Sequence, residues 1–248
     1  MTPSMPKTFQ KINDEGQFCA FPGITIVAAI PAESLNVWKT IYDYINEDQT
    51  IQRYYTPLPY TSYHMTAINL YTEHHHDADD WEDFITKEMP FFQQLQADFA
   101  SKALQPQITI DALTMSGAIQ LRLKLPPEQE IMIREIAHHH GVEAGIPPKF
   151  HITLAYQYQS ISPQEASLIK NKLNDKLKAW FNPQQPVITL DSPQLCYFND
   201  MTQFMPWHGD TYPFKSKQPT PTFSSRFFSQ QKSTTPLSEE TCTICAIS

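Results

Sequence analysis

The sequence predicts an α+β fold, in which helices and strands are mixed without strict strand-helix-strand alternation. Residues 119–125 alternate apolar and polar side chains, which is the period-two pattern of a half-buried strand. Residues 35–45 and 168–180 instead repeat apolar side chains at helical spacing, which indicates amphipathic helices. A chain of 248 residues can bury a substantial core, so one globular unit followed by a tail is the simplest organisation.

The first part of the chain is predicted to alternate strands with helical segments. A turn signal followed by a β-branched run predicts a buried strand within 18–30, and an amphipathic helix follows over 31–45. A segment rich in Pro and Tyr, residues 54–63, leads into a predicted strand at 64–71. The acidic, histidine-rich residues 73–83 indicate a surface loop or the start of a helix.

The second part repeats this order in a looser form. Ser162 is a good N-terminal cap for a helix, and Gly141 is a good C-terminal stop. The expected helices lie within 81–103, 127–140 and 162–181, and the expected strands are 107–113, 117–125, 150–157 and 187–198.

Two of the predicted strands carry the same local pattern of aromatic residue, histidine, apolar residue, threonine and apolar residue. The first copy contains His64 and Thr66, and the second contains His151 and Thr153. Residues two apart in a strand face the same side, so each histidine projects together with its threonine. A single His-x-Thr is more often structural, but two matched copies favour a shared site in a domain of two similar lobes.

This pairing suits chemistry at phosphorus. One imidazole can remove a proton from an attacking water or hydroxyl while the other protonates the leaving oxygen, and either histidine can take either role. The threonine hydroxyls can donate hydrogen bonds to the non-bridging phosphate oxygens, where negative charge accumulates.

The motifs resemble those of the two-histidine (2H) phosphoesterase superfamily, and in particular a branch catalogued only as a domain of unknown function. The resemblance covers about residues 8–208 and is carried by 21–25, 62–66, 150–156 and 196–201. It implies a bilobal fold of two pseudo-symmetric lobes, each with an antiparallel sheet and helices, and an active-site cleft between the sheets. It also implies that His64 and His151 are the acid and base, that Thr66 and Thr153 bind phosphate, and that no metal or other cofactor is required.

The leading hypothesis is a metal-independent phosphodiesterase, and we expect it to be a monomer. The resemblance implies a small nucleotide-like or RNA-end phosphodiester as substrate, either a cyclic phosphate or a 2′–5′ linkage. A formal net charge of −8 argues against a partner such as long nucleic acid, because that binding needs many Lys and Arg. Two alternatives stay open: a non-catalytic module that binds a phosphorylated ligand, and a structural domain whose two imidazoles are separated.

Four further residues are candidates for substrate binding. Tyr63, Phe150 and Tyr156 flank the motifs and could stack on a base, although packing in the core is the more ordinary role. The guanidinium of Arg122 could clamp a phosphate, or it could lie on a solvated sheet face.

Two histidine runs, 74–76 and 138–140, resemble metal-binding tracts. Consecutive residues of a helix or strand point in different directions, so a run of this kind supplies several ligands to one ion only in an irregular loop. We therefore interpret both runs as surface segments and assign no metal site, with adventitious metal affinity as the open alternative.

The folded domain is predicted to span 1–208, and residues 209–248 to form a flexible tail rich in Ser, Thr and Pro. The tail ends in Cys245-Ala-Ile-Ser, which matches the CaaX-like prenylation signal. The alternative is that this tetrapeptide occurs by chance. Cys242 could be palmitoylated as a second membrane anchor. No secretory signal is visible, and no apolar stretch reaches the roughly 20 residues of a membrane span. We expect a cytoplasmic protein that lipidation could bring to a eukaryotic membrane, either a eukaryotic protein or a microbial effector delivered into a host cell.

Overall fold

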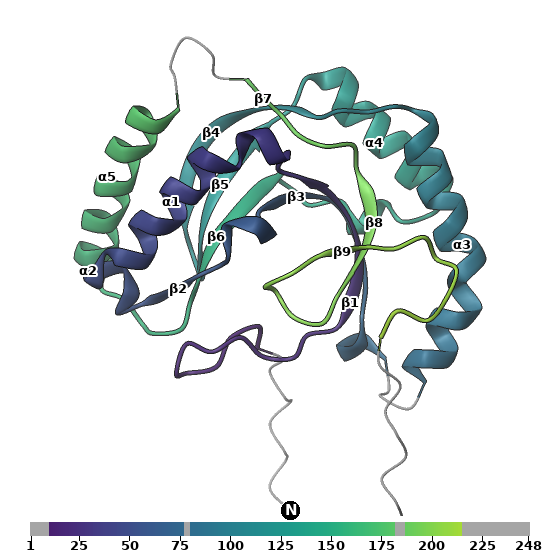
Figure 1. Cartoon of the computed structure of the whole chain (residues 1–248), viewed down its shortest axis with the longest axis horizontal. Coiled ribbons are helices and arrows are strands. Elements are labelled where there is room, and N and C mark those ends of the chain that lie inside the picture. Colours follow the sequence, from purple (N-terminus) through teal and green to yellow (C-terminus); the bar gives the residue numbers. More distant parts are fainter. Residues whose placement is uncertain (1–9, 77–79, 182–186, 215–248) are drawn as a thin grey trace, which may run out of the picture. The chain divides into compact units, whose positions relative to one another are not determined.

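The computed structural model describes residues 10–76, 80–181 and 187–214. All of them belong to one of two structural units, residues 1–215, and the second unit, residues 216–248, lies outside the described part of the chain. Within the first unit, helices flank a strongly curved sheet (Figure 1). Each strand pairing between the described residues is antiparallel, which confirms the predicted α+β class.

The strands form one hydrogen-bonded path in the order β7-β4-β5-β6-β3-β1-β8-β9, with β2 paired to β6 beside this path. Their bounds are β1 Gly23–Ala29, β2 Tyr55–Pro57, β3 His64–Thr72, β4 Gln107–Met115, β5 Ala118–Lys124, β6 His151–Gln157, β7 Ile188–Thr189, β8 Gln194–Phe198 and β9 Met205–Pro206.

Two lobes meet in the middle of this path. One contains β3, β1, β8 and β9, and the other contains β6, β5, β4, β7 and β2. The strands β3 and β6 join the lobes through one paired position, Met65 with Ile152. Each lobe is therefore an antiparallel sheet with a motif strand at its inner edge, which agrees with the predicted bilobal architecture.

The helices gather in two groups, on the left and right of Figure 1. In the left group, α1 packs on β2 and α5 packs on β4, while in the right group α3 packs on β8 and on α4. The helix bounds are α1 Leu35–Glu47, α2 Gln49–Gln52, α3 Trp81–Ser101, α4 Pro127–His139 and α5 Pro163–Trp180, with 3₁₀ turns η1 Ala32–Ser34, η2 Tyr60–Ser62, η3 Glu73–His75 and η4 Glu143–Gly145.

Burial explains why these segments are helical. The apolar stripe of α1 buries Trp38, Ile41 and Ile45, as its periodicity predicts. Ser162 caps α5 through a hydrogen bond from the backbone N–H of Glu165, which confirms the predicted start of that helix. Among the described residues, no helix is both long and apolar enough to pass through a bilayer.

Differences from the predictions occur mainly at short elements. The sequence pattern gave no sign of α2, β2 or β9, because two to four residues show no measurable period. The described chain also continues past the predicted domain end at 208. The Phe214 ring is buried, with its centroid 5.7 Å from that of Trp81. Cys242 and Cys245 lie outside the described residues.

Candidate active site

Both motifs lie at the first residues of their strands. His64 begins β3 and His151 begins β6, and both rings are half-buried. Met65 and Ile152, the residues between each histidine and its threonine, are fully buried at 0% exposure. Strand alternation therefore turns the apolar residues into the core and leaves the polar pairs on the opposite face.

Antiparallel pairing at Met65 and Ile152 brings the two motifs together. Because the strands run in opposite directions, His64 lies toward Thr153, and Thr66 lies toward His151. Each histidine is thus placed near the threonine of the other motif. This is the arrangement that an approximate two-fold axis through the Met65 and Ile152 pair would generate.

The two imidazoles are held in the same way. His64 Nδ1 lies 2.7 Å from the carbonyl oxygen of Ser62, and His151 Nδ1 lies 2.9 Å from that of Lys149. A carbonyl oxygen only accepts hydrogen bonds, so Nδ1 must carry the proton in both rings. In each histidine this leaves Nε2 as the nitrogen that can accept or deliver a proton.

A cavity of about 300 Å³ opens on this face, and both motif histidines and both motif threonines line it. The remaining walls include Lys11, Asn69, His75, Met201 and the aromatic residues Phe21, Tyr71, Tyr156, Phe198 and Phe204. A purely structural role for the histidines predicted separated imidazoles. The structure instead places both rings in one cavity.

Matched irregularities in β3 and β6 shape the cavity wall. In the pairing of β3 with β1, Ala67 is skipped between Thr66 and Ile68. In the pairing of β6 with β5, Leu154 is skipped at the equivalent position, directly after the motif threonine. A bulge of this kind shifts the alternation by one residue. As a result, Asn69 and Tyr156, each three residues after its threonine, return to the cavity.

Burial changes the acid-base behaviour of His64. Removal of water from the ring lowers its pKa from the ordinary 6.5 to about 4, and the hydrogen bond to Ser62 opposes this shift. The positive charges of His151 and Lys11 lower it further. The Phe204 ring also packs against His64, with centroids 4.0 Å apart. His64 is therefore neutral near pH 7 and suited to accept a proton.

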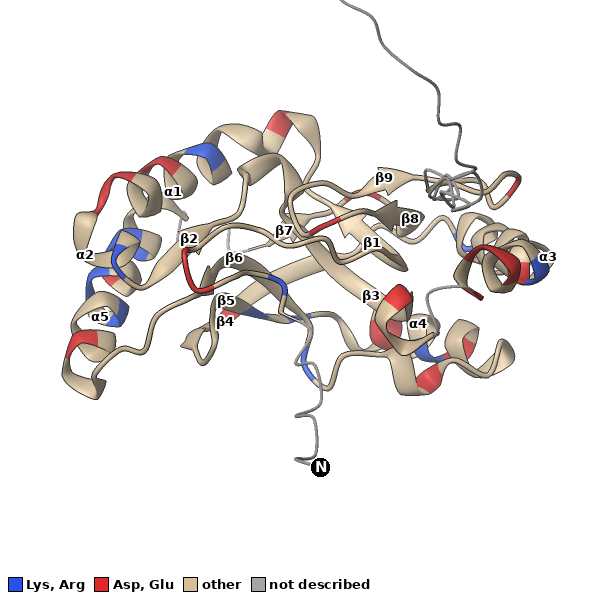
Figure 2. Cartoon of the chain, turned by 90° about the horizontal axis from the view of Figure 1, so that it is seen from below, with Lys and Arg blue, Asp and Glu red and all other residues tan. Residues whose placement is uncertain are grey.

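Lys11 is the only Lys, Arg, Asp or Glu among the described residues that line the cavity. Its Nζ lies 3.5 Å from the Tyr156 hydroxyl and 5.4 Å from the ring centres of Phe21 and Tyr156. The backbone N–H of Cys19 donates to the Lys11 carbonyl at 3.1 Å, which holds this segment in place. The strands β1, β3 and β6 carry no Lys, Arg, Asp or Glu, and their ribbons are tan in Figure 2.

Sequence reasoning missed Lys11, Asn69 and Gln120. Gln120 pairs with Thr153 across β5 and β6, and its Nε2 donates to the Thr153 hydroxyl oxygen at 3.3 Å. This bond leaves the Thr153 hydroxyl proton available for a ligand. Asn69 and Tyr156 each follow their motif threonine by three residues, and this shared spacing could have indicated both of them. No sequence signal marks Lys11.

The four predicted substrate-binding residues divide into two groups. Tyr156 lines the cavity, and Arg122 lies opposite His151 in the strand register without lining the cavity. Tyr63 and Phe150 lie in the core at 1% and 4% exposure, so they pack in the core and do not face the cavity. The physical reason is strand alternation, because a residue directly before the histidine faces the same side as the apolar residue after it.

The histidine runs differ in outcome. His75 is exposed, as a surface segment predicts, and it also lines the cavity and makes a 2.9 Å hydrogen bond with Thr72. At the other run, His139 and His140 do not diverge as expected for consecutive residues. Their ligand nitrogens converge with Asp98, because α4 ends at this point.

Comparisons with known proteins show what parts of the chain are similar to. Residues 11–122, a little under half of the chain, match the family model described as "2H-phosphodiest: Domain of unknown function (DUF1868)". Over 63 residues the chain is 40% identical to "Uncharacterized protein 127L" of Invertebrate iridescent virus 6, a match that spans 25% of this chain and 26% of that protein.

Solved structures show similarity over a longer stretch. The crystal structure of the conserved protein of unknown function ATU0111 from Agrobacterium tumefaciens str. C58 matches with a TM-score of 0.58 at 20% identity, covering 82% of this chain and 91% of that one. E. coli LigT complexed with 3′-AMP matches with a TM-score of 0.45 at 16% identity, over 76% of this chain and 96% of that one. The chain is thus similar to a 2H phosphodiesterase family model over 11–122, and its fold is similar to that of ATU0111.

Proposed function

We propose that this protein is a metal-independent phosphodiesterase of the 2H type, which acts on a small nucleotide-like or RNA-end phosphodiester. One observation carries the proposal. His64 and His151 line the same cavity, and both hold Nδ1 against a backbone carbonyl so that Nε2 is left for proton transfer. The match of residues 11–122 to a 2H phosphodiesterase family model supports it.

His64 is assigned as the general base and His151 as the general acid. Neutral His64 accepts the proton of an attacking water or ribose hydroxyl on Nε2 as the new P–O bond forms. His151 delivers the proton on its Nε2 to the leaving oxygen as the old P–O bond breaks. The lowered pKa of His64 supports this order, because the ring holds no proton near neutral pH before the reaction begins.

The charge that develops on phosphorus needs donors around it. Thr66 and Thr153 line the cavity beside the imidazoles and can donate to the two non-bridging oxygens. The Lys11 ammonium adds a positive charge in a cavity that otherwise holds no Lys, Arg, Asp or Glu among the described residues. Two neutral donors and one cation suit the single negative charge of a phosphodiester.

Cavity size and lining support a small substrate. A volume of about 300 Å³ is at the lower end of the range for small-molecule sites. Phe21, Tyr156 and Phe204 offer aromatic surface to a base or sugar, whereas long nucleic acid would need several phosphate-binding cations. We therefore propose cyclic phosphates and 2′–5′ linkages as the substrate classes.

The test is a substrate panel with the purified full chain and its His64→Ala and His151→Ala variants. The panel contains 2′,3′-cyclic phosphates, 3′,5′-cyclic nucleotides and 2′–5′ oligonucleotides. Each variant is expected to lose roughly 10²–10⁴-fold in kcat. His208→Ala is the matched control, because His208 is exposed and does not line the cavity.

Three outcomes have different meanings. Turnover by the wild type that both alanine variants retain would overturn the mechanism. Tight binding of a panel member with no turnover would instead indicate a non-catalytic module for phosphorylated ligands. Loss of the native circular dichroism spectrum in either variant would require the milder His64→Gln and His151→Gln variants for the same comparison.

A further inference from the structure

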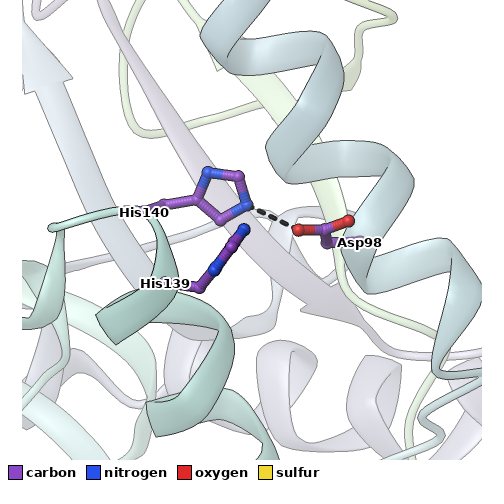
Figure 3. A group of neighbouring side chains, drawn as sticks. All are labelled: Asp98, His139 and His140. Carbon is purple, nitrogen blue, oxygen red and sulfur yellow. Dashed lines mark hydrogen bonds and ion pairs between the residues drawn. The ribbon is translucent and has the colours of Figure 1, made fainter.

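A cluster of potential metal ligands lies outside the catalytic cavity, where the end of α4 meets α3. Asp98 on α3, His139 at the end of α4 and His140 directly after it each offer one ligand atom, and these atoms lie within 4.8 Å of one another. Figure 3 shows the two imidazoles and the carboxylate facing one another from the two helices. None of the three residues lines the cavity that contains His64 and His151.

The helix end explains how adjacent histidines converge. Gly141 adopts a positive φ of 68°, and the N–H of Val142 donates to the carbonyl of Ala137 at 2.9 Å. These features stop α4 at His139, so His140 is the cap residue rather than part of a continuing helix. Both rings then lie at the end of the helix, where they can reach the neighbouring helix.

The carboxylate is already positioned. His140 Nε2 lies 2.8 Å from Asp98 Oδ2, and Gln94 Nε2 donates to Asp98 Oδ1 at 3.1 Å. The His140 side chain is 7% exposed and that of Asp98 is 30% exposed, so the pair is sheltered yet open on one side. Gln94 holds the carboxylate from behind, as outer-shell partners do in metal sites.

We propose that Asp98, His139 and His140 bind a divalent transition-metal cation, of which Zn²⁺ is the best fit. Two imidazole nitrogens and one carboxylate oxygen form a ligand set that suits Zn²⁺, and a water completes a tetrahedron. With metal-ligand distances of about 2.0–2.2 Å, the ligand atoms of a tetrahedral site lie about 3.3–3.6 Å apart. Side-chain rotations that move these atoms by about 1 Å are therefore sufficient.

The position of His139 favours a metal site over a simple ion pair between His140 and Asp98. His140 and Asp98 are already joined by a hydrogen bond, so that pair does not need His139 in order to form. His139 is exposed and could turn its ring into solvent, but Figure 3 shows one of its nitrogens directed between His140 and Asp98. The imidazole centroids of His139 and His140 lie 5.0 Å apart at 88°, which keeps the rings from stacking on each other.

The bound ion would act as a clamp between α3 and α4. It would take the place of the hydrogen bond between His140 Nε2 and Asp98 Oδ2, since a metal-bound imidazole offers the lone pair of Nε2 and carries its proton on Nδ1. Because the ion binds the folded arrangement, it raises the stability of the domain, with no step in phosphodiester chemistry. The proposal is independent of the proposed function.

Calorimetric titration of the chelator-treated full chain with Zn²⁺ tests this site. The decisive variant is His139→Ala, which keeps the partly buried pair of His140 and Asp98 and so preserves the fold. It is expected to weaken Zn²⁺ binding by more than the roughly 10–100-fold that loss of an outer-shell partner costs. Gln94→Ala should fall within that 10–100-fold range.

His138→Ala is the matched control, because this neighbour pairs with Glu143 and is not part of the cluster. The expected result is one Zn²⁺ equivalent, with a rise in Tm, for the wild type and for His138→Ala. X-ray absorption should show only nitrogen and oxygen ligands. Equal affinity for the wild type and His139→Ala would overturn the proposal, as would sulfur ligands at about 2.3 Å, since these would place the ion on cysteines.

Discussion

Met65 and Ile152 pair across the boundary between the two lobes, the central residue of one motif against the central residue of the other. Both side chains are fully buried at 0% exposure, and the residues on either side of each face the cavity. The same pair therefore joins the lobes and places the two motif histidines and threonines relative to one another. Under the proposed function, stability and activity are expected to be coupled at this position.

This coupling predicts the effect of trimming Ile152. Ile152→Ala should lower the free energy of unfolding by about 2–5 kcal/mol, because it removes buried methylenes and leaves a cavity, whereas Ile152→Val should cost about 0.5–1.5 kcal/mol. Urea unfolding followed by tryptophan fluorescence measures both. A loss below 0.5 kcal/mol for the alanine variant would show that the lobes can close over the gap.

The motif threonines are expected to act in the transition state. Thr66→Val and Thr153→Val should each lower kcat by about 10²–10³-fold with a small change in KM, because each removes one donor to the developing charge. Thr66→Ser and Thr153→Ser keep the hydroxyl and should recover most of the rate. Serine variants as slow as the valine variants would assign the threonines a packing role instead.

Lys11 is expected to bind the substrate phosphate. Lys11→Met should lower kcat/KM by roughly ten- to a hundredfold, the value of a hydrogen bond to a charged group. Lys11→Arg should retain most of the activity, and Lys39→Met should retain all of it, because Lys39 pairs with Asp43 on α1 away from the cavity. Equal kcat/KM for Lys11→Met and the wild type would remove Lys11 from the site.

The lowered pKa of His64 predicts the acid limb of the pH-rate profile. The base form is lost when the ring takes up a proton, so kcat/KM should fall as the pH drops through about 4, well below the ordinary 6.5. Lys11 contributes to the lowering, so Lys11→Met should move this limb to higher pH. A wild-type limb at 6.5 or above would contradict the assignment of His64 as the base.

The same shift makes stability depend on pH. Between pH 6.5 and about 4, the unfolded chain holds a proton on His64 that the folded chain does not. The unfolded state binds more protons in this window, so the free energy of unfolding falls as the pH is lowered through it. His64→Gln lacks this contribution and should lose less stability than the wild type between pH 7 and 5, as measured by urea midpoints.

The sequence predicted those parts of the fold and site that depend on regular periodicity. The two motif strands were visible because His64 and Thr66, like their counterparts in β6, lie two residues apart between apolar neighbours. The bulges at Ala67 and Leu154 have no such signature, and they decide that Tyr156 reaches the cavity. Alternation places Tyr63 in the core, which is the more ordinary role that the sequence indicates for it.

Groups brought in by tertiary packing could not be predicted. Lys11 comes from an irregular segment, and its place at the cavity depends on contacts with Phe21 and Tyr156. The meeting of His139 and His140 with Asp98 depends on how α3 packs on α4. Neither arrangement follows from local pattern, because a single chain position carries no information about the partner that packing supplies.

The approximate two-fold relation between the motifs has a consequence for regiochemistry. A perfectly symmetric cavity would treat the two ester oxygens of a phosphodiester alike, and either P–O bond could break. Phe204 packs on His64, and Lys11 reaches the cavity beside Tyr156. These two residues lie outside the repeated motif, and they distinguish one end of the cavity from the other. Under the proposed function, we therefore expect the choice of leaving group to be set by the parts of the protein that the duplication does not share.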